Sequence, residues 1–103
     1  MSEVCDIGKL VEAVLKEFPE KFRPEVQEIS YNHAKLTLGD LRIRIWCYPD
    51  TVEVSVDVGF EKGNISVWDF TTPEEIGPTT AGLAVLAGKF LKAIKGDNSG
   101  VKA

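Results

Sequence analysis

The spacing of apolar residues changes along the chain and predicts a different kind of element in each part. Near the start, apolar residues recur at i, i+3, i+4 and i+7, with charged residues on the other side. They are Ile7, Leu10, Val11, Val14, Leu15 and Phe18. This spacing predicts an amphipathic helix that Ser2 or Asp6 caps and that Pro19 ends. The loop at 19–25, which contains two prolines, follows it.

From about Val26 to Phe70 the apolar period is two, which predicts β-strands. Short turn signals interrupt the pattern at Asn32-His33, Gly39-Asp40, Pro49-Asp50-Thr51 and Glu61-Lys62-Gly63. The clearest strands are Leu41–Tyr48, Val52–Gly59 and Asn64–Phe70. β-Branched and aromatic residues dominate these segments, as is usual in strands. The sequence therefore predicts four or five short antiparallel strands joined as a meander.

A second helix is expected near the end of the chain. The loop at 71–78 contains two prolines, and Thr79-Thr80 then offers an N-cap for a helix over roughly 80–95. Its apolar residues are Ala81, Leu83, Ala84, Val85, Leu86, Ala87, Phe90, Leu91 and Ile94. They cover more than the usual one-third face, so the helix should contact more than one surface.

These elements predict a single α+β domain over residues 1–95, followed by a flexible tail at 96–103. The antiparallel meander should carry the N- and C-terminal helices on one face. A sheet that is apolar on only one side buries that side. Alternation and turn positions together fix which residues face the helices. The expected cross-strand pairs on the covered face include Leu36–Ile43, Ile45–Val56, Ile43–Val58 and Val58–Ile65.

The same register places aromatic and cationic residues together on the face that the helices leave open. The aromatic residues are Trp46, Tyr48, Trp68 and Phe70, and the cations are Lys35, Arg42 and Arg44. One expected row across the sheet reads His33, Trp46, Ser55 and Trp68. Two carboxylates, Glu53 and Asp57, share the face and nearly cancel its positive charge.

Aromatic rings beside arginines suit single-stranded nucleic acid, because bases stack on the rings and guanidinium groups bind phosphates. The pattern also allows three other interpretations. The rings could be covered by the 71–79 loop or the N-terminal segment, could form a homodimer interface, or could line a small-ligand pocket. In the expected register, Arg44 and Asp57 could also be a plain cross-strand ion pair.

Composition limits the function classes. The chain has 103 residues, 44% of them hydrophobic, and a net charge of −4, with a pI near 5.0. This balance gives no overall attraction to nucleic acid or to anionic membranes, so polyanion binding would need a local patch. The chain shows neither a secretory signal pattern nor an apolar run long enough for a membrane span, which predicts a cytoplasmic protein.

Catalytic and metal-binding signatures are missing from the sequence. It contains neither GxGxxG nor GxxxxGK[ST], and no catalytic constellation can be argued, so we expect a protein that is not an enzyme and has no cofactor. His33 is interpreted as a turn residue, and Glu74-Glu75 as the start of a short helix. One histidine and two cysteines do not make a structural zinc site. Cys5 and Cys47, far apart in the chain, are expected to be separate thiols rather than a disulfide.

The order of elements resembles a known family. The two terminal helices flank the runs Leu41–Trp46 and Val54–Val58 and the strand end Trp68-Asp69-Phe70. Together they look like the N-terminal domain of ThermoDBP, a single-stranded DNA-binding protein of hyperthermophilic archaea, and its stand-alone relatives. The resemblance covers about residues 1–95. It implies that Arg42, Arg44, Trp46 and Trp68, with Tyr48 and Phe70, contact single-stranded DNA, and that the protein forms oligomers.

Two hypotheses follow from the sequence. In the first, the chain binds single-stranded DNA or RNA without sequence preference, as a homodimer or tetramer assembled through the last helix. In the second, it is a protein-interaction or self-assembly module whose aromatic face is an interface, with no role in nucleic-acid binding.

Overall fold

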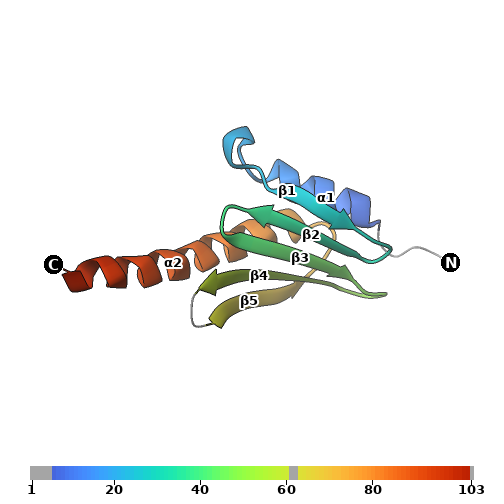
Figure 1. Ribbon diagram of the computed structural model, residues 1–103. Helices are drawn as coiled ribbons and strands as arrows, with labels where there is room; N and C mark the ends of the chain where they lie inside the picture. Colours follow the sequence, from blue (N-terminus) through green and yellow to red (C-terminus); the bar gives the residue numbers. More distant parts are fainter. Residues whose placement is uncertain (1–5, 61–62, 103) are drawn as a thin grey trace.

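The computed structural model describes residues 6–60 and 63–102 and shows one antiparallel sheet with two helices on one of its faces (Figure 1). The five strands lie in the order β1-β2-β3-β4-β5, the same as in the sequence, so the predicted meander is confirmed. The elements are α1 (Ile7–Lys16), the 3₁₀ turn η1 (Glu20–Phe22), β1 (Glu25–Ile29), β2 (His33–Leu38), β3 (Leu41–Cys47), β4 (Val52–Phe60), β5 (Gly63–Thr71) and α2 (Ile76–Lys102).

Helix α1 forms where the apolar spacing predicts it. The Asp6 carboxylate accepts hydrogen bonds from the backbone N–H groups of Gly8 and Lys9, at 3.1 and 3.4 Å, which confirms it as the N-cap. The other cap candidate, Ser2, lies outside the described residues. The helix ends at Lys16, two residues before Phe18, and the chain turns into η1 at Pro19.

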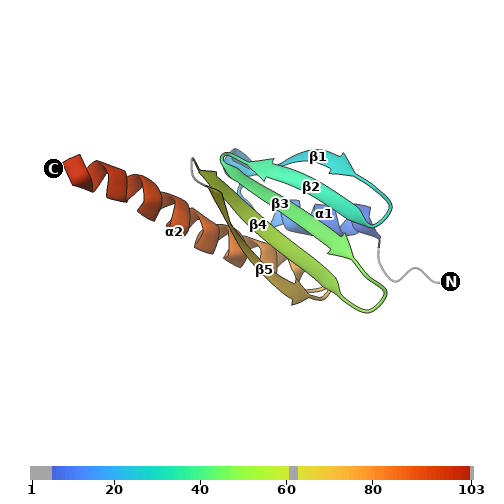
Figure 2. The same cartoon turned by 60° about the horizontal axis from the view of Figure 1, so that its bottom comes forward.

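The core lies between the sheet and the two helices, which cover the same face (Figure 2). Strand alternation places the apolar residues of β2, β3 and β4 on this side. The fully buried ones are Ala34, Leu36, Ile43, Ile45, Val52, Val54, Val56 and Val58. Each large aliphatic side chain contributes about 1.5–3 kcal/mol when it is fully buried. Leu10, Val11 and Val14 of α1 and Ile76, Ala84 and Ala87 of α2 close the core from the other side.

Helix α2 is longer at both ends than the sequence predicts. It begins at Ile76, so Thr79 and Thr80 lie inside the helix and do not cap it. Just before the helix, the hydroxyl of Thr72 accepts a hydrogen bond from the N–H of Glu75 at 3.3 Å. Pro78 is tolerated because N–H groups in the first turn have no acceptor within the helix.

At its other end, α2 continues to Lys102 through most of the expected 96–103 tail. The helix therefore projects past the end of the sheet (Figure 2). The flexibility of this stretch stays a prediction.

The register is confirmed at two of the three tight turns. Leu36 pairs with Ile43 across the turn at Gly39-Asp40, where Gly39 has φ of 59°, a left-handed conformation that favours glycine. Val58 pairs with Ile65 on either side of Glu61 and Lys62, which lie outside the described residues.

The predicted β3–β4 register is wrong by two residues. Ile45 pairs with Val54, not with Val56, and Ile43 pairs with Val56. The reason is that the turn is centred on Pro49-Asp50: the N–H of Tyr48 donates to the carbonyl oxygen of Thr51 at 2.9 Å. Proline suits the first central position of such a turn because its φ is fixed. A shift of two keeps every side chain on its predicted face but changes its neighbours across the strands.

The expectation of two separate thiols is wrong for Cys47, which is disulfide-bonded. The chain's other cysteine, Cys5, lies outside the described residues. The prediction went wrong because distance in sequence and the lack of a CxxC pair do not exclude bonding in the fold.

Candidate functional site

The sheet face opposite the helices carries the residues that the sequence singles out, and we call it the outer face. The corrected register arranges them in three rows across β2, β3, β4 and β5. The rows are Thr37–Arg42–Asp57–Ser66, Lys35–Arg44–Ser55–Trp68 and His33–Trp46–Glu53–Phe70. Tyr48 follows just after β3. All seven predicted site residues therefore lie on or beside this face, but Trp46 and Trp68 are in neighbouring rows and not in one row.

The aromatic residues form two groups. On β5, the rings of Trp68 and Phe70 meet edge to face, with centroids 5.4 Å apart and an interplanar angle of 84°. These side chains are 55% and 54% exposed, which is unusual for large apolar groups. On β2 and β3, the ring centroids of His33 and Trp46 lie 5.2 Å apart, with an interplanar angle of 36°. The sequence predicts a turn residue at His33, whereas in the structure its ring packs near the ring of Trp46.

The three cationic side chains of the outer face differ in their solvent exposure and in their partners. Arg42 is exposed and lies opposite Asp57. Arg44 is half-buried, and among the described residues its Nε atom has no hydrogen-bond partner. Lys35 lies with its Nζ atom 3.9 Å from the Oε1 atom of Glu28, an exposed pair that contributes little to stability.

The carboxylates of the outer face are engaged by hydroxyl groups. The Tyr48 hydroxyl donates to Glu53 Oε1 at 3.1 Å, and the Ser66 hydroxyl donates to Asp57. Desolvation raises the pKa of Tyr48 above its ordinary value, and the hydrogen bond and negative charge of Glu53 raise it further. The outer face thus holds charges of both signs and little net charge.

In the part of the chain that the structure describes, no three His, Cys, Asp or Glu side chains come together as metal ligands. None of the helices in this part has the length and apolar character needed to cross a membrane. An open depression lies at the β2–β3 turn, lined by Thr37, Gly39, Asp40, Arg42 and Gly59. It is polar, and its one exposed cation, Arg42, belongs to the outer face.

Comparison with protein-family models, with curated proteins and with solved structures finds no match to this chain.

Proposed function

We propose that the outer face binds single-stranded DNA without sequence preference, by stacking bases on exposed rings and contacting phosphates with arginines. The observation that carries the proposal is the pair Trp68 and Phe70. Both rings are more than half exposed on a sheet face that no described helix covers. Burying such rings against bases would remove their apolar surface from water, with about 1–3 kcal/mol gained per stacked base.

The row that contains Trp68 also contains two of the three cations, Arg44 and Lys35. Between Trp68 and Arg44 lies Ser55, whose short side chain is buried. Neighbouring strands are about 4.8 Å apart, so Arg44 lies about 10 Å from Trp68 across the row. Among the described residues the Nε atom of Arg44 is buried and has no hydrogen-bond partner, so this N–H would have to turn outward to reach a phosphate.

The charges limit how the DNA would bind. With three cations on the face, at most three phosphates are neutralised, which gives a slope of about −2 for log K against log salt. Glu28, Glu53 and Asp57 offset these cations, so long-range attraction is weak. Stacking would supply most of the affinity, and affinity should survive moderate salt better than in a basic DNA-binding protein.

The test is quenching of tryptophan fluorescence by oligonucleotides of about 20–30 nucleotides, long enough to cover one site or more. Trp68→Ala should weaken binding about tenfold, which corresponds to about 1.4 kcal/mol for one lost stacking contact. The matched control is Tyr31→Ala, since Tyr31 is 95% exposed and lies in the β1–β2 connection, outside the strands of the sheet. Absence of quenching at low salt, or equal losses in the two variants, would refute the proposal. RNA and duplex DNA serve as competitors.

A protein-binding role is the second candidate, and the near balance of charge on the outer face favours it. Protein interfaces are rich in aromatic residues and arginine and need no excess of positive charge. In this case light scattering would show an oligomer that Trp46→Arg disrupts, because Trp46 lies in the middle of the sheet on β3. Single-stranded DNA would then leave the fluorescence unchanged.

A further inference from the structure

The two edges of the sheet differ in how they are protected. β1 has a bulge between Val26 and Glu28 and carries the acidic residues Glu25 and Glu28. Bulges and charges of this kind hinder pairing with another strand. β5 is the other edge. It pairs with β4 through nine successive residues without a register shift, and Asp69 is its one charged residue. A long, regular, nearly uncharged edge is a template for a further strand.

The backbone groups on the open side of β5 can be identified from the hairpin. Phe60 pairs with Gly63 although only two residues separate them in the sequence, so they form a hydrogen-bonded pair, and every second residue of β5 after Gly63 bonds to β4. The N–H and C=O groups of residues 64, 66, 68 and 70 then point outward. One contact agrees with this assignment: the outward N–H of Phe70 donates to the Oδ1 atom of its neighbour Asp69 at 2.9 Å.

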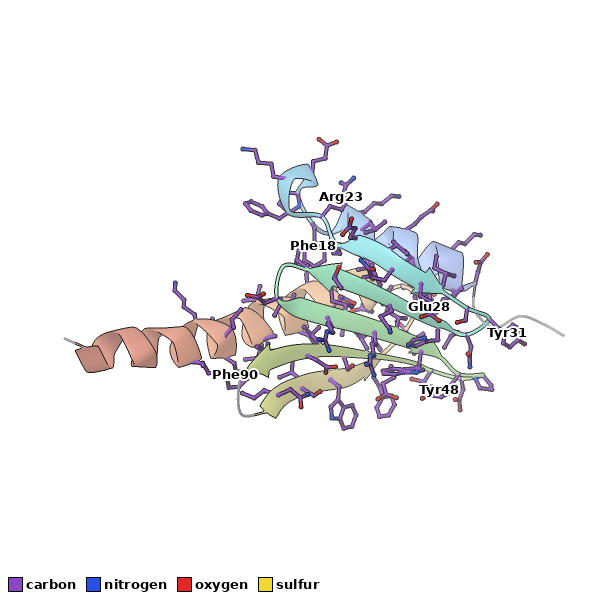
Figure 3. The ribbon with its side chains drawn as sticks, in the orientation of Figure 1. Phe18, Arg23, Glu28, Tyr31, Tyr48 and Phe90 are labelled. Carbon is purple, nitrogen blue, oxygen red and sulfur yellow. The ribbon has the colours of Figure 1, made fainter. Side chains whose placement is uncertain are left out.

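Apolar residues of α2 lie on the same side of the molecule as this edge. Thr79 contacts Thr71 of β5, with their hydroxyl oxygens 2.9 Å apart. Leu86 and Phe90 follow Thr79 at i+7 and i+11, so they lie on the same side of α2. Figure 3 shows Phe90 on the side of α2 where β5 lies. These two side chains are 43% and 39% exposed, while Gly77, on the other side of α2, packs against α1.

We infer that β5 pairs antiparallel with β5 of a second copy of this chain, which joins two sheets into one of ten strands. The register that fits best places Ser66 opposite the partner's Ser66. Ile65 then meets the partner's Val67 on the helix side, and Asp69 meets Gly63, which has no side chain. The registers centred on Val67 and on Trp68 oppose Asp69 to the partner's Ile65 and to the partner's Val67, and would bury its charge beside an apolar residue. The register centred on Asp69 opposes two like charges.

A second copy fits this edge better than an unrelated strand, because it brings a helix α2 as well as a strand β5. The sheets and the helices of the two copies can then pack together at the same time. Strands are about 4.8 Å apart and α2 packs under β4 and β5, so the two α2 helices would lie about 10–14 Å apart. At that distance Leu86 and Phe90 can cover the partner's helix. The nine-residue edge is about 30 Å long, and the sheet and helix layers together are about 20 Å thick. The contact would therefore bury about 600 Å² of surface on each copy, which is near the lower limit for a stable dimer.

The decisive test is disulfide trapping at the two-fold axis. Opposed residues in a hydrogen-bonded pair have Cα atoms about 5.5 Å apart, within the range of about 4.4–6.8 Å that a disulfide needs. Ser66→Cys should therefore give a covalent dimer under mild oxidation. Asn64→Cys is the matched control on the same edge: its two copies would be about 13 Å apart and should not crosslink. The unchanged chain, with its native cysteines, gives the background.

A second measurement is sedimentation across the micromolar range. The unchanged chain should be a dimer. Ser66→Pro should dissociate it, because proline lacks the outward-pointing N–H of residue 66, while every backbone N–H that bonds to β4 is kept. If Ser66→Pro does not fold by circular dichroism, Phe90→Lys replaces it, with Val85→Lys as the control on the solvent side of α2. A monomeric unchanged chain, or equal trapping of Ser66→Cys and Asn64→Cys, would overturn the inference.

This inference does not depend on the proposed function, and the two can fail separately. A dimer trapped at Ser66 with no quenching by DNA would leave the edge pairing standing and remove the DNA-binding proposal. If both hold, the joined sheets would place Trp68 and Phe70 of both copies beside one another on one continuous outer face. A longer oligonucleotide could then contact both copies.

Discussion

Gly77 allows α1 and α2 to approach each other closely, and its replacement gives a sharp test of the fold. A Cβ atom at this position would lie 2.6 Å from Cγ of Glu17 and 3.0 Å from the carbonyl oxygen of Ala13. The Glu17 side chain could move aside, but the backbone oxygen could move only with α1. Pro78 adds a second restriction, because a residue with a Cβ atom before proline disfavours the helical region.

The expected size of the effect follows from two opposing contributions. Replacing glycine by alanine inside a helix normally stabilises by up to about 1 kcal/mol. Overpacking typically costs about 1–3 kcal/mol. Gly77→Ala should therefore range from neutral to about 2 kcal/mol destabilising.

Gly82 is the matched control for Gly77. It lies in the same helix with nothing within 4 Å of its Cβ position, so Gly82→Ala should stabilise. The free energy of unfolding in urea should differ between the two variants by about 1–3 kcal/mol, or roughly 4–8 °C in Tm for each kcal/mol. If Gly77→Ala stabilises as much as Gly82→Ala, the close helix approach described above is incorrect.

Three further predictions test single contacts by urea unfolding. Asp6→Ala should lower the free energy of unfolding by about 1 kcal/mol, because α1 loses its N-cap. Thr80 is fully buried and, among the described residues, its hydroxyl has no hydrogen-bond partner, so Thr80→Val should raise the free energy of unfolding by about 1 kcal/mol. Thr79→Val should lower it by a similar amount, because it breaks the hydrogen bond between the hydroxyls of Thr79 and Thr71 of β5. The raised pKa of Tyr48 means that the folded state holds the phenol proton more tightly, so this contribution is present below about pH 10 and is lost at higher pH. Tyr48→Phe should therefore lose less stability than the unchanged chain when the pH is raised above 10, and equal losses would contradict the contact with Glu53.

Most of the fold follows from the alternation of apolar residues. A meander of four or five strands and the faces of their side chains could be predicted because one-sided burial makes any odd shift of register very unfavourable. A shift by two has no such penalty, and the β3–β4 hairpin shows the consequence. Alternation alone could not separate a turn at Pro49-Asp50 from one at Asp50-Thr51. The preference of proline for the first central turn position would have decided it.

The start of α2 was missed for a related reason. Pro73 and Pro78 suggest a loop, yet both positions tolerate proline at the beginning of a helix. The run Thr72-Pro73-Glu74-Glu75 matches a capping-box spacing, with a hydroxyl residue followed three positions later by glutamate. The observed hydrogen bond from the Glu75 N–H to the Thr72 hydroxyl fits that signal.

The two-residue correction changes what the outer face can do. In the predicted register, Trp46 and Trp68 shared a row and would have formed one stacking platform. In the structure, Trp68 shares its row with Arg44, and Trp46 is separated from Phe70 by Glu53. If the outer face binds DNA as proposed, stacking would be concentrated at the β5 edge, where the most exposed rings of the outer face lie. A single chain would then offer only a narrow binding surface. The same edge is the unprotected one, so a second copy paired along β5 would turn two narrow surfaces into one continuous surface.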